Sequence, residues 1–185
     1  MPRQRFASQS RSSHYRAAKR LGFRTREIRP SRTRRRTVVS QLSKQDVNEI
    51  CTLRTPLETL ALRLGFAKGA NTMCADLKAN MNASERISYP AELAQFELEF
   101  HEIIVRAAGH ERLLASWLNL RSQIRLMLIE RVSIDARLRQ DTLQGHRELV
   151  EAVETGDANR AVAVLDAHLK AQHQWLMKSF TDQQR

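Results

Sequence analysis

One glutamate and three histidines occupy positions at which a metal ion could bind. Glu97 and His101 lie four residues apart, about one helical turn, whereas His146 and His168 lie on what we predict to be two successive antiparallel helices. Carboxylate oxygens and imidazole nitrogens are the ligands that zinc, nickel, manganese and iron bind in proteins. The sequence therefore indicates a divalent-metal site, and it does not choose among these metals.

Each of these four residues falls on a helix face that is otherwise apolar. Between residues 93 and 108 the apolar side chains recur at helical spacing, and Glu97 and His101 share their face. His146 and His168 lie among apolar residues in the same way on the two later helices. A carboxylate buried without a partner costs several kcal/mol, so the position of Glu97 predicts a compensating cation.

A turn at residues 155–157 can bring His146 and His168 together. Gly156 is typical of a helix end and Asp157 of a helix start, and the two histidines lie ten residues before and twelve residues after Gly156. At a rise of about 1.5 Å per residue they stand roughly 15 and 18 Å from the turn, so their levels agree within roughly 3 Å. With Glu97 and His101 they can form a site of three histidines and one carboxylate.

The alternative for any one of these histidines is a hydrogen-bonded core residue, which is the more common role for a lone histidine on an apolar face. Three histidines and a carboxylate that all face inward favour a shared metal site. The other histidines are placed differently: His14 is in a basic segment, His110 follows the Gly109 turn, and His173 is rotated away from the apolar face of His168.

Several segments together resemble the FCD ligand-binding domain, the C-terminal half of the FadR-like branch of GntR-type bacterial transcription regulators. The similarity covers residues 38–180. The segments that carry it are residues 42–47 and 53–58, Glu-Leu-Glu-Phe-His at 97–101, the turn at Gly109, residues 146–153 followed by Gly156-Asp157, and residues 161–168. The resemblance implies an antiparallel helical bundle whose central pocket binds a metal through an aspartate and three histidines. A small organic acid often completes the coordination in this family. By position, the ligands here would be Glu97, His101, His146 and His168.

One ligand position departs from the family pattern, because aspartate is usual where this chain has Glu97. Glutamate is still an oxygen ligand, but its extra methylene changes how it reaches the metal. The resemblance also implies a homodimer and a small organic acid as effector. Arg54 and Arg125 lie in predicted helices that could present a cation to this acid, and a solvated arginine or a surface ion pair is the alternative for each.

Composition and periodicity predict an all-α domain over residues 41–182. Helical patterns separated at residues 65–69, 87–90, 109 and 156–157 give six or seven helices. Pro56 should start, kink or split the first of them. Cys51 and Cys74 lack metal-type spacing and are expected to be buried thiols. Because no apolar run is long enough to cross a bilayer and no secretion signal is present, we expect a cytoplasmic protein without a membrane partner.

Positive charge is concentrated in residues 1–40. This segment holds 13 Lys and Arg residues against one acidic residue, net +12, whereas residues 41–185 hold 18 against 19, net −1, which together give +11. Its few apolar residues predict a disordered head or the remnant of a winged helix-turn-helix. The head could bind DNA phosphates through Arg24, Arg26, Arg29, Arg34, Arg35 and Arg36. A solvated tail without a partner is the open alternative.

A GntR-type regulator has a complete winged helix-turn-helix before the junction at Leu42, and the 41 residues present here are too few for one. We therefore expect a truncated, misread or degenerate head, and the prediction of sequence-specific DNA binding does not extend to this chain alone. The leading interpretation is a metal-dependent sensor of a small carboxylate in a transcription regulator, not an enzyme. The alternatives are a metalloenzyme acting on a small carboxylate, and a metal-free helical dimerisation module with Trp117, Leu118 and Trp175 at its interface.

Overall fold

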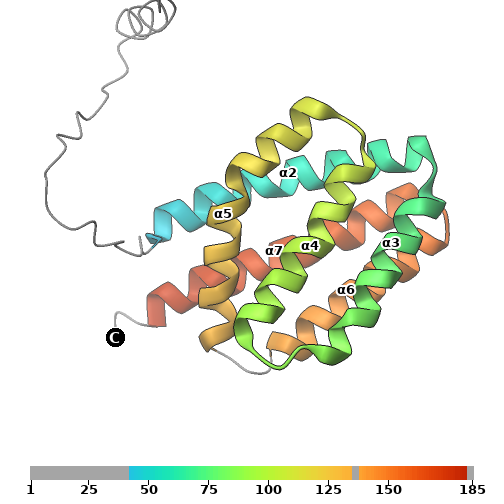
Figure 1. The fold of residues 1–185 in the computed structure, drawn as a ribbon. Coiled ribbons are helices and arrows are strands. Elements are labelled where there is room, and N and C mark those ends of the chain that lie inside the picture. Colours follow the sequence, from blue (N-terminus) through green and yellow to red (C-terminus); the bar gives the residue numbers. More distant parts are fainter. Residues whose placement is uncertain (1–41, 135–137, 183–185) are drawn as a thin grey trace, which may run out of the picture. The chain divides into compact units, whose positions relative to one another are not determined.

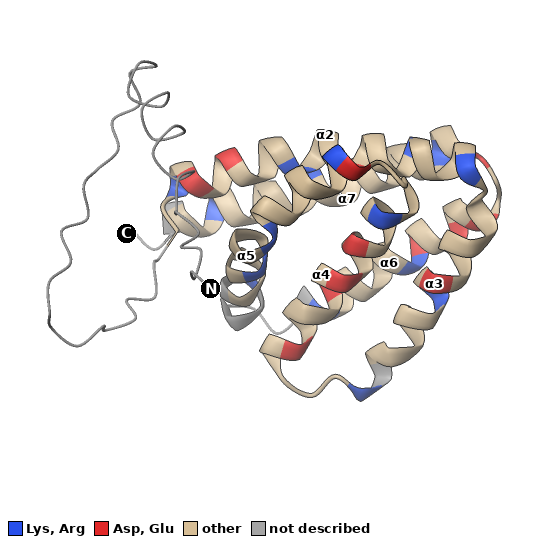
Figure 2. Cartoon of the chain, turned by 45° about the horizontal axis from the view of Figure 1, so that its top comes forward, with Lys and Arg blue, Asp and Glu red and all other residues tan. Residues whose placement is uncertain are grey.

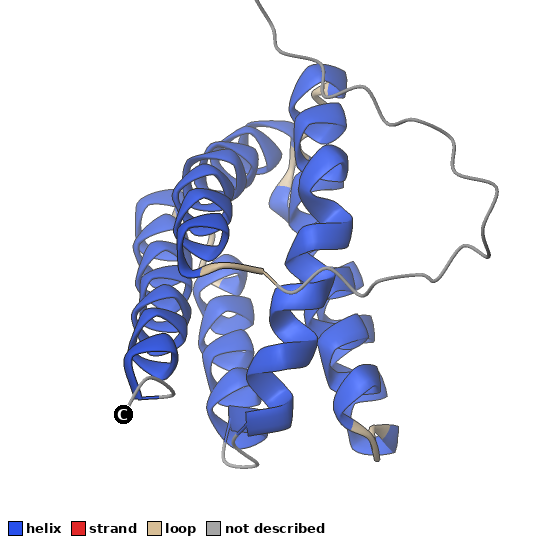
Figure 3. Cartoon of the chain, turned by 90° about the vertical axis from the view of Figure 1, so that its left-hand side faces the viewer, coloured by secondary structure: helices blue, strands red, loops and turns tan. Residues whose placement is uncertain are grey.

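The computed structural model describes residues 42–134 and 138–182, and within these ranges every regular element is a helix (Figures 1 and 3). They are α2 (Lys44–Lys68), α3 (Ala70–Ala83), a short 3-10 helix (Ser84–Arg86), α4 (Pro90–Ala107), α5 (Glu111–Ile134), α6 (Leu138–Glu154) and α7 (Ala158–Asp182). The predicted all-α fold is confirmed. None of these helices is long and apolar enough to cross a membrane. The basic head, with the predicted DNA-binding residues Arg24, Arg26, Arg29, Arg34, Arg35 and Arg36, lies outside the described ranges.

The turn between α6 and α7 forms where the sequence predicts it. Gly156 has a φ of 75°, a left-handed conformation that suits glycine at a helix end. Asp157 accepts hydrogen bonds from the backbone N–H groups of Asn159 and Arg160 at 2.9 and 3.0 Å, and so caps the start of α7. The two helices that carry His146 and His168 are therefore joined as an antiparallel pair.

Pro56 lies inside α2, so two of its three predicted roles, starting or splitting a helix, are wrong. The break predicted at residues 65–69 is found at the last of them, where Gly69 separates α2 from α3. Gly65 is instead a buried helical residue, where an added Cβ would lie 3.3 Å from the sulfur of Met73. We infer that Gly65 serves close packing between helices rather than a turn.

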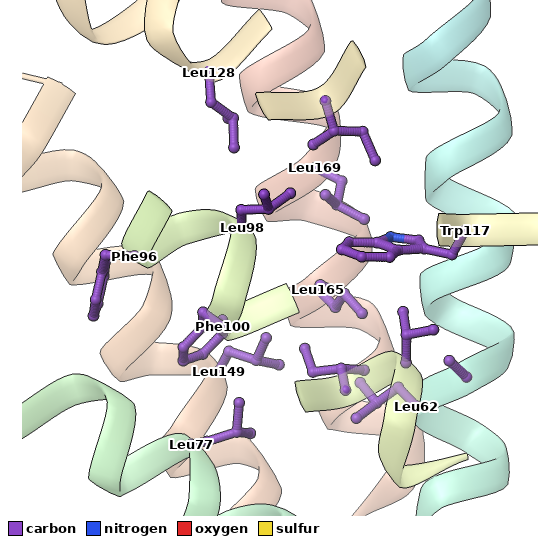
Figure 4. Packing of buried hydrophobic residues seen from close by; sticks show 14 of the residues in the cluster. Leu62, Leu77, Phe96, Leu98, Phe100, Trp117, Leu128, Leu149, Leu165 and Leu169 are labelled. Atoms are coloured by element: carbon purple, nitrogen blue, oxygen red, sulfur yellow. The ribbon is translucent and has the colours of Figure 1, made fainter. Parts of the chain in front are cut away.

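The helices pack around α4, which contacts α2, α3 and α5, while α7 contacts α2 and α6 (Figure 1). Figure 4 shows buried apolar side chains from these helices turned toward one another, among them Leu62, Leu98, Phe100, Leu149 and Leu165. Acidic and basic residues are interspersed along the helices (Figure 2). Both cysteines are buried free thiols, as predicted. Trp117 is fully buried, so it belongs to the core rather than to an interface.

Candidate metal centre

Three of the four predicted ligands converge inside the bundle. One ring nitrogen from each of His101 on α4, His146 on α6 and His168 on α7 lies within 4.8 Å of the other two. The ring centroids are 5.3, 5.5 and 5.0 Å apart, and His101 and His146 are fully buried. Bonds of about 2.1 Å to one tetrahedral ion place ligand nitrogens about 3.4 Å apart, so a small inward movement would complete a three-histidine site.

Gly145 makes room for this cluster on the α6 side. A Cβ added at Gly145 would lie 2.5 Å from Nδ1 of His168, closer than any side chain could sit without displacing the ring. Because glycine stands directly before His146, the backbone of α6 can approach His168 on α7. The sequence therefore places a glycine where a larger residue would displace the ring of His168.

Glu58 on α2, which was not predicted as a site residue, lies against His101. Oε2 of Glu58 lies 2.7 Å from Nδ1 of His101, and both side chains are fully buried. The two atoms form a close contact whose geometry is not that of a hydrogen bond. An ionised carboxylate at this distance favours the tautomer of His101 with its proton on Nδ1, which leaves the lone pair of Nε2 for a metal. The other oxygen of Glu58 accepts from Nε of Arg54 at 2.7 Å and from the indole N–H of Trp117 at 2.8 Å.

Burial favours the neutral form of the three imidazoles, and neighbouring groups favour the ionised form of Glu58. Burial alone raises the pKa of Glu58, but its interactions with Arg54 and then with His101 outweigh burial and hold this pKa well below its usual value. Burial lowers the pKa of His101, although Glu58 opposes the shift. Burial and then the neighbouring positive groups lower the pKa values of His146 and His168 well below 6.5. Neutral imidazole is the form that binds metals.

His146 has no hydrogen-bond partner on either ring nitrogen within the described part of the chain. Its ring stacks on Phe100, with centroids 3.8 Å apart and planes 3° from parallel. Buried polar atoms are nearly always satisfied in folded proteins, so an unsatisfied imidazole facing two other histidines indicates a missing ligand. The donor set thus fits a divalent metal.

Glu97 is fully buried, but it lies outside the histidine cluster. Nη1 of Arg131 lies 2.9 and 3.2 Å from its two carboxylate oxygens, and Nε2 of Gln172 donates to Oε1 at 2.7 Å. Burial of this carboxylate does require a cation, as the sequence predicts, and in this arrangement the cation is Arg131. The structure therefore does not bring Glu97 to the histidines as a fourth ligand.

The two arginines predicted to bind an acid lie in different places. Arg54 is buried, and its Nη2 has no partner among the described residues. Arg125 is exposed on α5, donates to Gln95 at 3.4 Å, and lines a surface groove of about 410 Å³ between α3, α4 and α5. Arg131, which sequence reasoning missed, is buried beside Glu97 and also keeps one donor, Nε, without a partner in this part of the chain.

Comparison with known proteins identifies the domain. The profile of the FCD domain family matches residues 49–171. The chain belongs to the FCD domain family. The metal-free FCD domain of TM0439, a candidate transcriptional regulator, shares this fold with a TM-score of 0.64 at 20% identity, over 77% of this chain and 99% of that one.

Two related proteins are transcriptional repressors, in agreement with the resemblance to GntR-type regulators. One is the "Probable D-xylose utilization operon transcriptional repressor" of Paenarthrobacter nicotinovorans, 29% identical over 138 residues, which cover 73% of this chain and 60% of that protein. The other is the gluconate operon transcriptional repressor of Bacillus licheniformis, 29% identical over 147 residues, which cover 74% and 56%. The FCD chain thus spans little more than half the length of these relatives.

Proposed function

We propose that this FCD domain is the sensor of a bacterial cytoplasmic transcription regulator, in which His101, His146 and His168 hold a divalent metal that binds a small organic acid. The proposal is carried by the convergence of three imidazoles, of which His101 and His146 are buried and His168 is half-buried. Zinc, nickel, manganese or iron suits such ligands and can leave coordination positions open for an acid. Glu97 could become a metal ligand only if its carboxylate gave up its contacts with Arg131.

The charges around the histidines support an anionic effector. Two buried cations, Arg54 and Arg131, balance two buried anions, Glu58 and Glu97. A divalent ion adds two positive charges to this interior, and uncompensated buried charge is costly. A carboxylate would offset part of that charge. Nη2 of Arg54 and Nε of Arg131 are buried without protein partners in the described ranges, and guanidinium groups match carboxylates well.

Calorimetry on the full chain tests this function. We expect acetate, malonate, citrate or gluconate to bind after zinc loading and not after chelation, whereas acetamide, the neutral analogue of acetate, should not bind. Arg54→Lys keeps the charge beside Glu58 but loses the Nη2 donor, so it should weaken acid binding about tenfold. Arg125→Gln, at the exposed arginine, should leave acid binding unchanged. Failure of every acid to bind the zinc-loaded chain would refute the sensor.

We also propose a homodimer that pairs through α2. Leu53 and Leu60 are 54% and 48% exposed, and they lie seven residues apart on one face of the helix. Glu49 and Arg63 are exposed and stand seven residues before and after Pro56. An antiparallel pairing of two α2 helices about Pro56 would bring Glu49 of each copy to Arg63 of the other, and Leu53 to Leu60. Contact with DNA through the basic residues of segment 1–40 is part of the same proposal.

A further inference from the structure

Gln172 connects the candidate metal centre to two other helices. It lies on α7 one turn after His168, and it is only 4% exposed. Its amide nitrogen lies 2.7 Å from Oε1 of Glu97 on α4 and 2.9 Å from Nε2 of His168. Its amide oxygen accepts from Nη1 of Arg54 on α2 at 3.3 Å. One rigid amide therefore contacts groups on α2, α4 and α7.

The partners of Gln172 fix the direction in which its amide faces. The carboxylate of Glu97 can only accept, and the guanidinium of Arg54 can only donate. The amide nitrogen must therefore face Glu97 and the amide oxygen must face Arg54. Since His168 also meets the amide nitrogen, its Nε2 has to accept a hydrogen bond, which places the imidazole proton on Nδ1.

This hydrogen bond opposes metal coordination through either nitrogen of His168. Coordination through Nε2 would use the lone pair that now accepts from Gln172. Coordination through Nδ1 would leave the proton of the neutral imidazole on Nε2, where it would face an amide N–H that can only donate. In both cases the contact between His168 and Gln172 has to break before the metal is bound.

We propose that Gln172 is a latch that competes with the metal for His168 and transmits occupancy of the site to α2. When the amide leaves His168, its bonds to Glu97 and Arg54 must change as well, because a single planar group makes all three. Arg54 belongs to α2, which directly follows the N-terminal segment in the sequence. This inference depends on the proposed metal site. It explains how the hydrogen bond from Gln172 fixes His168 in the metal-free form.

The test measures Zn²⁺ binding by the full chain with Gln172→Met, which keeps the length of the side chain and removes its amide. An ordinary hydrogen bond corresponds to about a two- to tenfold change in an equilibrium constant, so the variant should bind Zn²⁺ about two- to tenfold more tightly against a competing chelator dye. Its metal-free form should also unfold at lower urea concentration. Gln174→Met, at an exposed position of α7, should change neither value.

A second measurement on the unaltered chain does not depend on the folding of a variant. Nitrogen-15 spectra of the histidine side chains report which ring nitrogen carries the proton, and metal-free His168 should carry it on Nδ1 at neutral pH. An Nε2–H tautomer would overturn the latch, and so would a Gln172→Met variant that binds Zn²⁺ no more tightly than the wild type. A wild-type chain that binds no Zn²⁺ would instead refute the metal site, and the latch with it.

Discussion

Oε2 of Glu58 lies 2.7 Å from Nδ1 of His101, and neither side chain is exposed to solvent. A carboxylate on α2 thereby favours the Nδ1–H tautomer of a histidine on α4. Arg54 and Trp117 hold the second oxygen of the same carboxylate. The buried polar network of Glu58, Arg54 and Trp117 therefore contacts the side of His101 that faces away from the cluster, and it positions Nε2 of His101 for a metal.

Glu58→Gln should both destabilise the fold and weaken metal binding. The change removes the negative charge beside buried Arg54, which should cost about 3–5 kcal/mol of the free energy of unfolding. It also lets His101 adopt either tautomer, so the affinity for Zn²⁺ should fall about 10- to 100-fold. Urea denaturation and chelator competition measure the two effects. Glu151→Gln, at an exposed glutamate of α6, is the control, and a folded Glu58→Gln chain with wild-type affinity would disprove the orienting role.

Gly145→Ala should displace His168. The new Cβ would lie 2.5 Å from Nδ1 of its ring, so the imidazole must move and the affinity for Zn²⁺ should fall at least about tenfold. Alanine favours helix over glycine by about 1 kcal/mol, so helix content should not fall. Gly65→Ala provides the comparison, because its Cβ would lie 3.3 Å from the sulfur of Met73 and 3.4 Å from Cβ of Ala107, and it would not meet a histidine of the cluster. Equal Zn²⁺ affinities in the two variants would show that Gly145 has no special role.

The metal-free chain should lose stability as the pH falls below about 6.5. Burial, and then positive neighbours, lower the pKa values of His146 and His168 well below 6.5. The unfolded chain therefore takes up protons near pH 6.5 that the folded chain does not, and the free energy of unfolding decreases from there toward the lowered pKa values. The slope should approach about 1.4 kcal/mol per pH unit for each histidine. Urea denaturation across this range measures it.

His146→Phe is the matched variant for the pH dependence, because it keeps an aromatic ring beside Phe100 and removes one titrating group. The free energy of unfolding of this variant should change less steeply with pH than that of the wild type, and the difference should equal the contribution of one histidine. Identical slopes in the two proteins would mean that His146 is not held neutral in the folded state.

Charge reversal on α2 tests the homodimer. Glu49→Arg or Arg63→Glu alone should weaken association, because each creates two like-charge contacts across a two-fold axis, whereas the double reversal should restore it. Leu60→Glu should raise the dimer dissociation constant about tenfold or more. Sedimentation equilibrium measures all of these, with Tyr89→Glu, at another exposed apolar residue, as the control. If the substitutions on α2 leave the dimer dissociation constant unchanged, the interface lies elsewhere. A monomeric wild type would exclude the proposed homodimer.

The three histidines could be predicted because each lies on a helix whose inward face is marked by apolar neighbours. The turn at residues 155–157 also fixed the relative levels of His146 and His168. The partner of Glu97 could not be predicted in this way. Either a metal or an arginine satisfies a buried carboxylate, and the choice of Arg131 depends on how α5 packs against α4, which periodicity does not specify.

Glu58, Arg131 and Gln172 were missed although a signal was available. Each is a polar residue within an apolar helix face: Glu58 lies near Ala61 and Leu62 along α2, and Gln172 lies between Leu169 and Leu176 along α7. Polar residues at such positions are as informative as histidines, because their burial requires a partner. Which partner they find depends on tertiary packing, so the network itself emerges only from the structure.

Elemental analysis of the purified full chain, compared with the His146→Ala, His168→Ala double variant, tests the central claim most directly. His110→Ala, at an exposed histidine outside the cluster, is the control. After exposure to zinc, nickel, manganese and iron salts followed by dialysis, we predict about one tightly bound divalent ion per chain in the wild type and the control, and none in the double variant. Equal metal content in all three proteins, or no metal in the wild type, would contradict the three-histidine centre.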